Sequence, residues 1–376
     1  MLAGITLGIG VGFLLAGLGY LKARWATRLL TRLRGRADAS VAVVIATRNE
    51  ESVIENTLRT LLTTAPPGAR VLVVDESTDA TPEILRRLAL EFPTLEVLSD
   101  PQVRGKPAAL NLALDHVTED IVLLLDADAR VDGAFLAEYT ALFANPQVQA
   151  VFADFASYNA RRSLPVVFQD LFFAFAKTFV FSGLVWRPVF MNCGVFVRRE
   201  VFRKVGKFDP RTTVDDFDLG IRMAKQGLHA AFVLGRRCQI QYALGLRDLF
   251  RQHCRWYTGG IKKMFEEIQR GDLSYVVLMA GVGVVVYFPQ MALILGKALS
   301  IPFLVTVVLP GAMSALYAAA IFAYLLHRPQ SGREVLANVV LGFPAVYLLL
   351  QAAIAVSFFR TFTSNHSWYK VRRERA

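Results

Sequence analysis

Cysteine and histidine, the side chains that most often bind zinc, are scarce in this chain of 376 residues. The three cysteines (Cys193, Cys238, Cys254) and the five histidines show no zinc-ligand spacing. The cysteines also lack paired spacing, which suits a protein kept in a reducing cytosol. The chain has neither a Gly-x-Gly-x-x-Gly fingerprint nor a Walker loop, so nicotinamide and P-loop chemistry have no support.

Acidic residues are outnumbered by basic ones, and the formal net charge is +11. The excess basic residues gather beside apolar segments and in residues 247–270, without any recognisable nucleic-acid-binding module. Attraction to anionic lipid headgroups is the simpler explanation. We therefore expect membrane lipids, and not nucleic acid, as partners.

Long uncharged runs mark both ends of the chain. Residues 2–20 carry no charge and are long enough to cross a bilayer. A signal peptide is the alternative, but no charged leading region precedes the run and no Ala-x-Ala-type cleavage signal is evident. We expect a retained transmembrane helix over residues 1–21. Within 274–359 we expect about three more, at 275–300, 301–326 and 335–359.

Basic residues predict the orientation of the chain in the membrane. The juxtamembrane linker, 22–37, is rich in Lys and Arg and contains no acid, which predicts a cytoplasmic domain behind it and an integral protein of the plasma membrane or an equivalent membrane. Four crossings would then put the basic tail, 360–376, on the other side, against the same rule. A re-entrant segment or an exported tail would resolve this conflict, and both stay open.

Two further segments are predicted to lie at the membrane surface. The helix over 246–273 is amphipathic, with basic residues suited to headgroups and aromatic residues suited to the bilayer. The apolar segment 166–186 contains Asp170 and Lys177, which disfavours a spanning role and indicates an interfacial one.

The middle of the chain, 38–245, alternates strand and helix patterns. This alternation predicts an α/β domain with a mostly parallel sheet covered by helices on both faces. The expected strands are 41–47, 71–75, 95–99 and 121–125, and the expected helices are 50–62, 81–91 and 107–116. Thr47, Asp75 and Asp126 all fall at carboxyl ends of strands, where such sheets bind ligands.

Asp126 and Asp128 follow a buried strand at a spacing of two. If the strand geometry persists, both carboxylates point the same way, and a divalent cation shared with a diphosphate relieves their repulsion. The alternative is a pair of turn residues before a helix that starts near Gly133 and is capped by Asp132. Asp75 has the same two interpretations: a loop and cap residue, or an acceptor for the base or ribose of a nucleotide.

Seven ordered motifs resemble those of membrane-bound family 2 glycosyltransferases. They are VVIATRNEE, VVDESTD, GKPAALNLAL, LLLDADARVD, NCGVFVRREVFRKVGKFD, VDDFDLGIRMAKQG and QHCRW, and they cover about residues 41–256. The chain is similar to cellulose, chitin and hyaluronan synthases, to ceramide glucosyltransferases and to polyprenyl-phosphate glycosyltransferases. The resemblance implies a Rossmann-like GT-A domain flanked by transmembrane and interfacial helices.

The resemblance also implies a nucleotide-diphosphate sugar as donor and Mg²⁺ or Mn²⁺ as cofactor, with Asp128 a more direct metal ligand than Asp126. The donor-binding residues carried over from the family motifs are Ala46, Thr47, Arg48, Glu50, Asp75, Lys106, Asp126, Ala127 and Asp128.

Asp216 is the implied catalytic base, which takes a proton from the acceptor hydroxyl during inversion at the anomeric carbon. The alternative is that Asp215, Asp216 and Asp218 cap the helix that runs to Gln226, where negative charge suits the helix dipole. The family's Gln-x-x-Arg-Trp motif, here Gln252, Arg255 and Trp256, is predicted to contact the diphosphate and the acceptor, and Asp215 is grouped with it.

Three positions depart from the family pattern: Ala46 replaces the commoner Pro, Glu76 replaces a second Asp, and Arg130 follows the Asp pair. These departures weaken any transfer of donor identity. The chain is also shorter than large polymer synthases, which favours transfer of a sugar to a lipid or glycan acceptor. A processive polysaccharide synthase is the alternative. A transporter or structural membrane protein is disfavoured because Lys297 is nearly the only charge within the predicted spans.

Overall fold

The computed structural model describes residues 1–35, 39–100, 102–159, 163–184, 193–228, 230–327 and 332–363. The chain divides into two compact units. The sheet unit comprises Ala23–Asn159, Arg187–Tyr242 and Arg372–Ala376, and the helical unit comprises Met1–Lys22, Ala160–Trp186 and Ala243–Val371.

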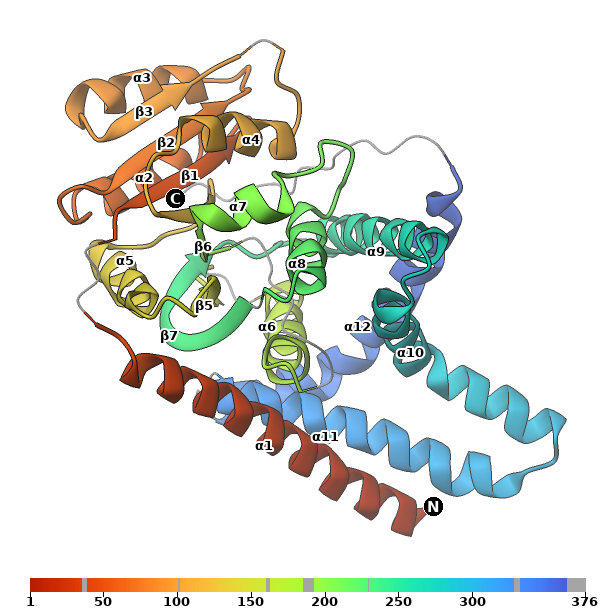
Figure 1. Cartoon of the computed structure of the whole chain (residues 1–376). Coiled ribbons are helices and arrows are strands. Elements are labelled where there is room, and N and C mark those ends of the chain that lie inside the picture. The colour runs from red at the N-terminus through yellow and green to blue at the C-terminus, as the bar shows by residue number, and fades with distance from the viewer. Residues whose placement is uncertain are drawn as a thin grey trace. The chain divides into compact units, whose positions relative to one another are not determined.

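One sheet forms the centre of the sheet unit (Figure 1). Among the described residues it has seven strands in the order β3-β2-β1-β4-β6-β5-β7. Strands β3, β2, β1 and β4 are parallel, β6 is antiparallel to both of its neighbours, and β7 is parallel to β5. The strands are β1 (Val41–Thr47), β2 (Arg70–Asp75), β3 (Leu95–Leu98), β4 (Ile121–Asp126), β5 (Ala150–Ser157), β6 (Val195–Arg198) and β7 (Ala230–Ile240). The predicted mostly parallel sheet is therefore confirmed.

Helices flank the strands where the amphipathic patterns predict them. Helix α3 packs against α2 and β3, and α4 packs against β1 and β2 (Figure 1). The helices of this unit are α2 (Ile54–Leu62), α3 (Thr81–Glu91), α4 (Lys106–His116), α5 (Gly133–Thr140), η1 (Ala141–Ala144), α7 (Arg199–Val205) and α8 (Asp215–Lys225). Helix α2 begins at Ile54 and not at the predicted Glu50, because a turn follows Asn49, whose φ is +58°.

The helical unit is built from helices, most of them long and apolar, and α9 amphipathic. They are α6 (Leu164–Ala176), η2 (Lys177–Phe181), α9 (Leu246–Gln269), α10 (Ser274–Ala298), η3 (Leu304–Val308), α11 (Leu309–His327) and α12 (Gly332–Thr361), together with the first part of α1 (Leu2–Arg32). Helix α1 continues through the basic segment to Arg32, so most of the predicted linker is helical.

Small residues let α1 and α11 approach closely. A Cβ atom on Gly8 would lie 2.0 Å from the carbonyl oxygen of Gly311, and one on Gly12 would lie 2.3 Å from that of Ala315. Ser314 Oγ also donates to the carbonyl oxygen of Ile5 at 3.1 Å. Glycines four residues apart on such a helix are typical of tight packing between membrane helices.

Within the ranges that the structure describes, three helical stretches are long and apolar enough to cross a membrane: Leu2–Arg32, Leu164–Phe181 and Leu304–His327. The first and third fall where spans are predicted. The second contains most of the segment predicted to be interfacial, and both Asp170 and Lys177 are buried there. Helices α10 and α12 form where the other two spans are predicted, and their spanning role stays a prediction. Residues 185–186 of the interfacial segment and 364–376 of the tail lie outside the described residues.

Candidate active site

The carboxyl ends of β1, β2 and β4 are level with one another. Thr47 is paired with Asp75, and Ala46 is paired with Asp126. The predicted gathering of these residues at one edge of the sheet is therefore confirmed. Parallel strands produce this edge because the chain always leaves them on the same side.

Hydrogen bonds hold Asp75 in place. Its Oδ1 atom accepts from Thr47 Oγ1 at 2.8 Å and from Ser77 Oγ at 2.5 Å. Ser77 Oγ in turn accepts from the backbone N–H of Asn49 at 2.7 Å, and Asn49 Oδ1 accepts from the N–H of Thr78 at 2.8 Å. The loops after β1 and β2 thus fix each other, which supports a preformed nucleotide-binding surface.

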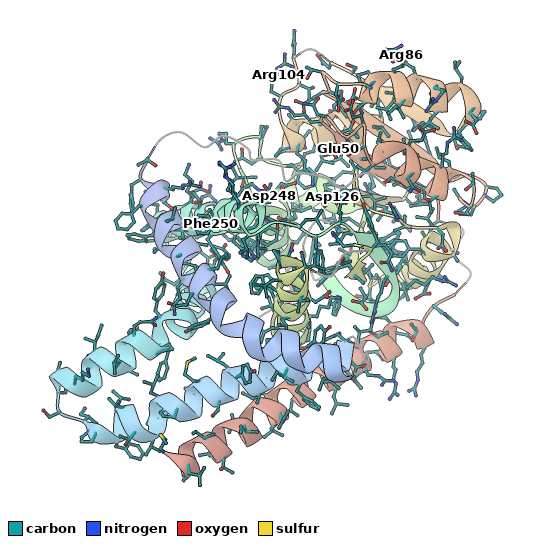
Figure 2. All side chains as sticks on the ribbon, turned by 180° about the vertical axis from the view of Figure 1, so that it is seen from behind. Glu50, Arg86, Arg104, Asp126, Asp248 and Phe250 are labelled. Atoms are coloured by element: carbon teal, nitrogen blue, oxygen red, sulfur yellow. The ribbon has the colours of Figure 1, made fainter. Side chains whose placement is uncertain are left out.

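Glu50 and Arg48 complete the loop after β1. Arg48 is exposed, whereas Glu50 is buried and its N–H donates to Thr81 Oγ1 at 2.9 Å. The carbonyl of Glu50 accepts from the N–H groups of Val53 and Ile54, which starts α2. Glu50 and Asp126 are both labelled in Figure 2.

Lys106, the first residue of α4, forms an ion pair with Asp126. The Nζ–Oδ1 distance is 2.5 Å. Gly105, immediately before the helix, has a φ of +85°, a conformation that a residue with a Cβ rarely adopts. The N–H of Gly105 donates to Glu76 Oε2 at 2.9 Å. The family departure at Glu76 therefore has a local role, which is to hold the turn that presents Lys106.

Asp128 lies in a different environment from Asp126. Strand β4 ends at Asp126, and a turn follows in which the N–H of Ala129 donates to the carbonyl of Asp126 at 3.0 Å. The prediction that strand geometry aligns the two carboxylates is wrong, because the turn replaces the alternation. Asp128 is only 3% exposed and its Oδ2 accepts from the N–H of Gln241 at 3.3 Å, whereas the Asp126 side chain is 33% exposed.

Asp132 caps the following helix. Its Oδ1 accepts from the N–H of Phe135 at 2.7 Å, as the alternative interpretation of this segment predicted. The cap does not compete with a role for Asp126 and Asp128, because a third carboxylate provides it.

Asp215 and Asp216 open α8 and act electrostatically on Lys106. Burial lowers the pKa of Lys106, but Asp126, Asp215 and Asp216 together raise it above its ordinary value. Asp126 pairs with the ammonium group, and Asp215 and Asp216 act on it electrostatically, although the three acids come from distant parts of the sequence. Asp218 has a separate partner, since its Oδ2 accepts from Arg222 Nε at 2.8 Å.

Val214 is the N-cap residue immediately before α8, and no side chain forms a capping hydrogen bond to this helix. Asp216 Oδ1 accepts from the adjacent N–H of Phe217 at 2.8 Å. The acids of the first turn still suit the positive end of the helix dipole. A helix-stabilising role and a chemical role are thus compatible for Asp216.

The carboxylates suit a cation that is shared with a substrate. Among the described residues, no group of three or more His, Cys, Asp or Glu side chains is arranged to hold a metal ion. A closed, protein-only zinc site is therefore a poor fit. Mg²⁺ is commonly bound through one or two carboxylates plus substrate phosphates, and Asp126 and Asp128 fit that requirement.

The Gln-x-x-Arg-Trp residues lie on α9, in the helical unit. The Trp256 ring stacks on Phe172 with centroids 6.5 Å apart and meets Phe173 edge-on at 6.2 Å. Gln252 Oε1 is buried and has no protein hydrogen-bond partner in the described chain. The predicted contacts of Gln252, Arg255 and Trp256 with acceptor and diphosphate stay predictions.

His253, within the same motif, is a buried residue that the sequence analysis did not single out. It is fully buried, with ring centroids 5.0 Å from both Phe172 and Trp256 and 5.7 Å from Tyr257. Neither ring nitrogen has a protein partner among the residues described. Burial lowers its pKa to about 3, so the imidazole is neutral.

Ser77, Thr81 and Gln241 were also missed. Ser77 and Thr81 fall within or just after the VVDESTD motif, so their position was a usable signal. Gln241 contributes a backbone N–H, which any residue except proline provides. The amino-acid type at this position could therefore not have predicted the contact.

Comparisons with known proteins identify the family and the fold of the chain. Residues 38–259 match the family described as Glycosyltransferase like family 2. A beta-monoglucosyldiacylglycerol synthase from Nostoc sp. is 29% identical over 237 residues, which cover 60% of this chain and 50% of that protein. A poly-beta-1,6-N-acetyl-D-glucosamine synthase from Staphylococcus epidermidis is 22% identical over 67% of this chain and 63% of its own length.

Among solved structures, a mannosyltransferase from Pyrobaculum calidifontis in complex with GDP-Man and Mn²⁺ has a TM-score of 0.57 at 22% identity. The match covers 95% of this chain and 99% of that one, and it confirms the predicted GT-A fold. The chain spans about half the length of the Nostoc synthase.

Proposed function

Because the chain belongs to glycosyltransferase-like family 2, we propose that it is an inverting, metal-dependent hexosyltransferase. It moves a sugar from a nucleotide-diphosphate sugar to a lipid or lipid-linked acceptor at a membrane. The helical unit anchors it as an integral membrane protein, with the sheet unit in the cytoplasm.

One observation carries this proposal: Asp126, Asp215 and Asp216 all act on the ammonium group of Lys106. The reaction needs carboxylates, which hold a cation or accept a proton, and it needs a positive charge, which binds phosphate. This cluster contains both kinds of group. A structural ion pair alone requires a single carboxylate, so the additional acids support a chemical role.

In the proposed reaction the acceptor hydroxyl oxygen attacks the anomeric carbon of the donor sugar. The bond from that carbon to the phosphate oxygen breaks, and the nucleoside diphosphate leaves with the electron pair. The carboxylate of Asp216 takes the hydroxyl proton as the new bond forms, which makes the oxygen a better nucleophile. Attack opposite the leaving group inverts the configuration.

The donor is held by the edge of the sheet. Asp75, fixed by Thr47 and Ser77, accepts hydrogen bonds from the base or the ribose. Lys106 exchanges its ion pair with Asp126 for a bond to the diphosphate oxygens. Asp128 and Asp126 would hold the Mg²⁺ or Mn²⁺ ion, which would supply charge stabilisation to the leaving diphosphate. The Mn²⁺ in the Pyrobaculum mannosyltransferase supports a divalent metal.

The long apolar helices and the Nostoc synthase support a lipid acceptor. A lipid acceptor stays in the bilayer, so an enzyme anchored there meets it at high effective concentration. The Gln-x-x-Arg-Trp segment, amphipathic and basic, suits the membrane surface where such an acceptor presents its hydroxyl.

The experiment is a transfer assay with the purified full chain in lipid nanodiscs. Labelled UDP-, GDP- and dTDP-sugars are supplied separately with Mg²⁺ or Mn²⁺ and membrane lipids, and EDTA provides the metal-free control. We expect the label in the lipid fraction, and we expect EDTA to abolish it.

The same assay separates the alternatives. Label in a product of high molecular mass that resists lipid extraction would favour a polysaccharide synthase, a possibility raised by the Staphylococcus relative. Absence of transfer from every donor, in a folded protein, would contradict the proposed function.

A further inference from the structure

Cys193 and Cys238 come together next to the candidate active site, although 45 residues separate them. Their Sγ atoms are 2.9 Å apart. A Cβ atom on Gly194, the residue after Cys193, would lie only 3.2 Å from the Cβ of Cys238. A disulfide requires an S–S distance of about 2 Å and Cβ atoms about 4 Å apart, so a small adjustment brings the sulfurs to bonding distance.

The register of the sheet places this pair beside the acidic residues. Strand β6 pairs with β4 so that Val195 is opposite Leu124. Cys193 precedes Val195 by two residues and Asp126 follows Leu124 by two, so both lie just beyond the same end of this antiparallel pair. Asp126 and Asp128 both act electrostatically on the Cys193 thiol, which places the two carboxylates near the sulfur.

Cys238 is joined to the same segment from the other side. Its neighbour Gln239 exchanges two backbone hydrogen bonds with Arg130, at 2.7 and 3.0 Å. Three residues beyond Cys238, the N–H of Gln241 donates to Asp128. The two cysteines therefore belong to the two chain segments that border Asp126–Arg130.

We propose that Cys193 and Cys238 form a reversible thiol–disulfide site, and that closing the disulfide stops sugar transfer. Cys193 is half-buried and meets the oxidant, whereas Cys238 is 0% exposed and acts as the resolving thiol. A reactive thiol beside a resolving one is the usual arrangement of redox-sensitive cysteines.

The oxidant is a peroxide, and hydrogen peroxide balances the reaction. The sulfur of Cys193 attacks one peroxide oxygen, the O–O bond breaks, and water leaves with the thiol proton, which gives a sulfenic acid. The sulfur of Cys238 then displaces the sulfenic oxygen, which leaves as a second water, and the S–S bond forms. Two thiols are oxidised by two electrons in total, and one peroxide is reduced to two waters.

The reaction is expected to be slow. Burial raises the pKa of Cys193, as do its hydrogen bond to Cys238 and the nearby Asp126 and Asp128, so the protonated thiol dominates. Slow oxidation means that the pair responds to sustained exposure to peroxide and not to a brief one. A covalent link between the segments that border Asp126–Arg130 fixes their separation, and a misplacement of about 1 Å can cost about 100-fold in rate.

The first test is chemical and does not depend on the proposed function. The full chain, purified under reducing conditions in detergent, is treated with hydrogen peroxide, alkylated with N-ethylmaleimide and digested for mass spectrometry. We expect a peptide pair linked through Cys193 and Cys238, and Cys254 alkylated. The C254S variant should give the same link, whereas C238S should leave a sulfenic acid on Cys193 that dimedone traps.

Two results would overturn the proposal. One is that Cys193 and Cys238 are alkylated at every peroxide dose. The other is that they are linked to Cys254 or to another chain instead of to each other. The control residue Cys254 is buried in the helical unit, with its Sγ 3.8 Å from the carbonyl oxygen of Ala353. Its partner is a backbone group, so it has no resolving thiol nearby among the described residues.

The second test measures transfer and rests on the proposed function. Each protein's oxidised rate is divided by its own reduced rate, so changes in basal activity do not matter. We expect wild type and C254S to fall about 10-fold or more and to recover in dithiothreitol, and we expect C193S and C238S to stay near a ratio of one. A linked peptide with an unchanged rate would overturn the switch. A linked peptide in a chain without transferase activity would leave the thiol site standing and refute only the proposed function.

Discussion

Two basic side chains, the half-buried Lys106 in one unit and the fully buried His253 in the other, show opposite pKa shifts. Lys106, at the edge of the sheet, has three carboxylates around it, and they raise its pKa above the ordinary value despite burial. His253, on α9, is packed among Phe168, Phe172, Trp256 and Tyr257, and burial lowers its pKa to about 3. Desolvation acts on both residues, and the presence or absence of opposite charge decides the outcome.

The comparison indicates different tasks for the two regions. A lysine that stays charged among carboxylates can exchange a carboxylate for a phosphate oxygen. A histidine that stays neutral among aromatic rings adds no charge to its surroundings and serves mainly as part of the packing. Substitutions in each of the two environments therefore test which region carries out the chemistry and which region only contributes packing.

The largest effect is expected from Asp128→Ala, which removes the buried carboxylate of the charged region. Transfer should fall by about 10³-fold or more, and metal-dependent binding of the nucleotide should be lost, because the cation loses a ligand. Isothermal titration with nucleoside diphosphate and Mn²⁺, together with the transfer assay, measures both. The control is Asp115→Ala, which removes an exposed acid paired with Lys207 and should change neither. Full activity in Asp128→Ala would refute its role.

Asp216→Asn is expected to lower kcat by about 10²- to 10³-fold with little change in nucleotide binding, since the amide cannot accept the proton. The matched control is Asp218→Asn, in the same helical turn, whose partner is Arg222. That variant should lower the melting temperature and retain most of kcat. Equal loss of kcat in both variants would reduce Asp216 to a helix-stabilising role.

Lys106→Met should raise the KM for the donor by about 10-fold, with a smaller change in kcat, because the ammonium contributes mainly to phosphate binding. Steady-state kinetics at several donor concentrations provide the measurement. Lys207→Met, which breaks an exposed ion pair with Asp115, is the control. A donor KM equal to that of wild type in Lys106→Met would show that the lysine serves only to neutralise Asp126.

The smallest effect on activity is expected for His253→Phe, which should instead change the dependence of stability on pH. In the folded chain the pKa of His253 is about 3, against 6.5 for an ordinary histidine. Between these values the unfolded chain binds one more proton, so the free energy of unfolding falls by about 1.4 kcal/mol for each pH unit of acidification. Above pH 6.5 this contribution is constant. Phenylalanine does not titrate and should remove that part of the slope.

Thermal unfolding in detergent between pH 7 and pH 4.5 measures this change. Phe172→Leu is the control, since it disturbs the same cluster but keeps His253, and should lower the melting temperature while retaining the acid slope. An unchanged slope in His253→Phe would mean that His253 takes up its proton in the folded chain.

The local pattern of apolar and turn residues was sufficient to predict the parallel strands β1, β2 and β4. Strand β1 coincides with the predicted 41–47, and β2 and β4 agree with their predicted ranges to within one residue at each end. These strands are short apolar runs bounded by turn residues, and their carboxyl ends identified Thr47, Asp75 and Asp126. The strands β5, β6 and β7 were not identified individually.

The environment of each site residue was less predictable. The spacing of Asp126 and Asp128 indicated a shared cation, but the turn after β4 separates a half-exposed carboxylate from a buried one. Glu76 stood out only as a departure from the family pattern, and its bond to Gly105 became visible in the structure.

The sequence by itself determined the α/β architecture, the apolar helices and the identities of the acids, because strand period, apolar run length and motif order are local properties of the chain. Only the tertiary structure decided that Lys106 has three acidic neighbours, that His253 has aromatic ones, and that Cys193 meets Cys238. Each of these is a contact across more than one element, and the electrostatics of a side chain depend on which neighbours replace the water that folding removes.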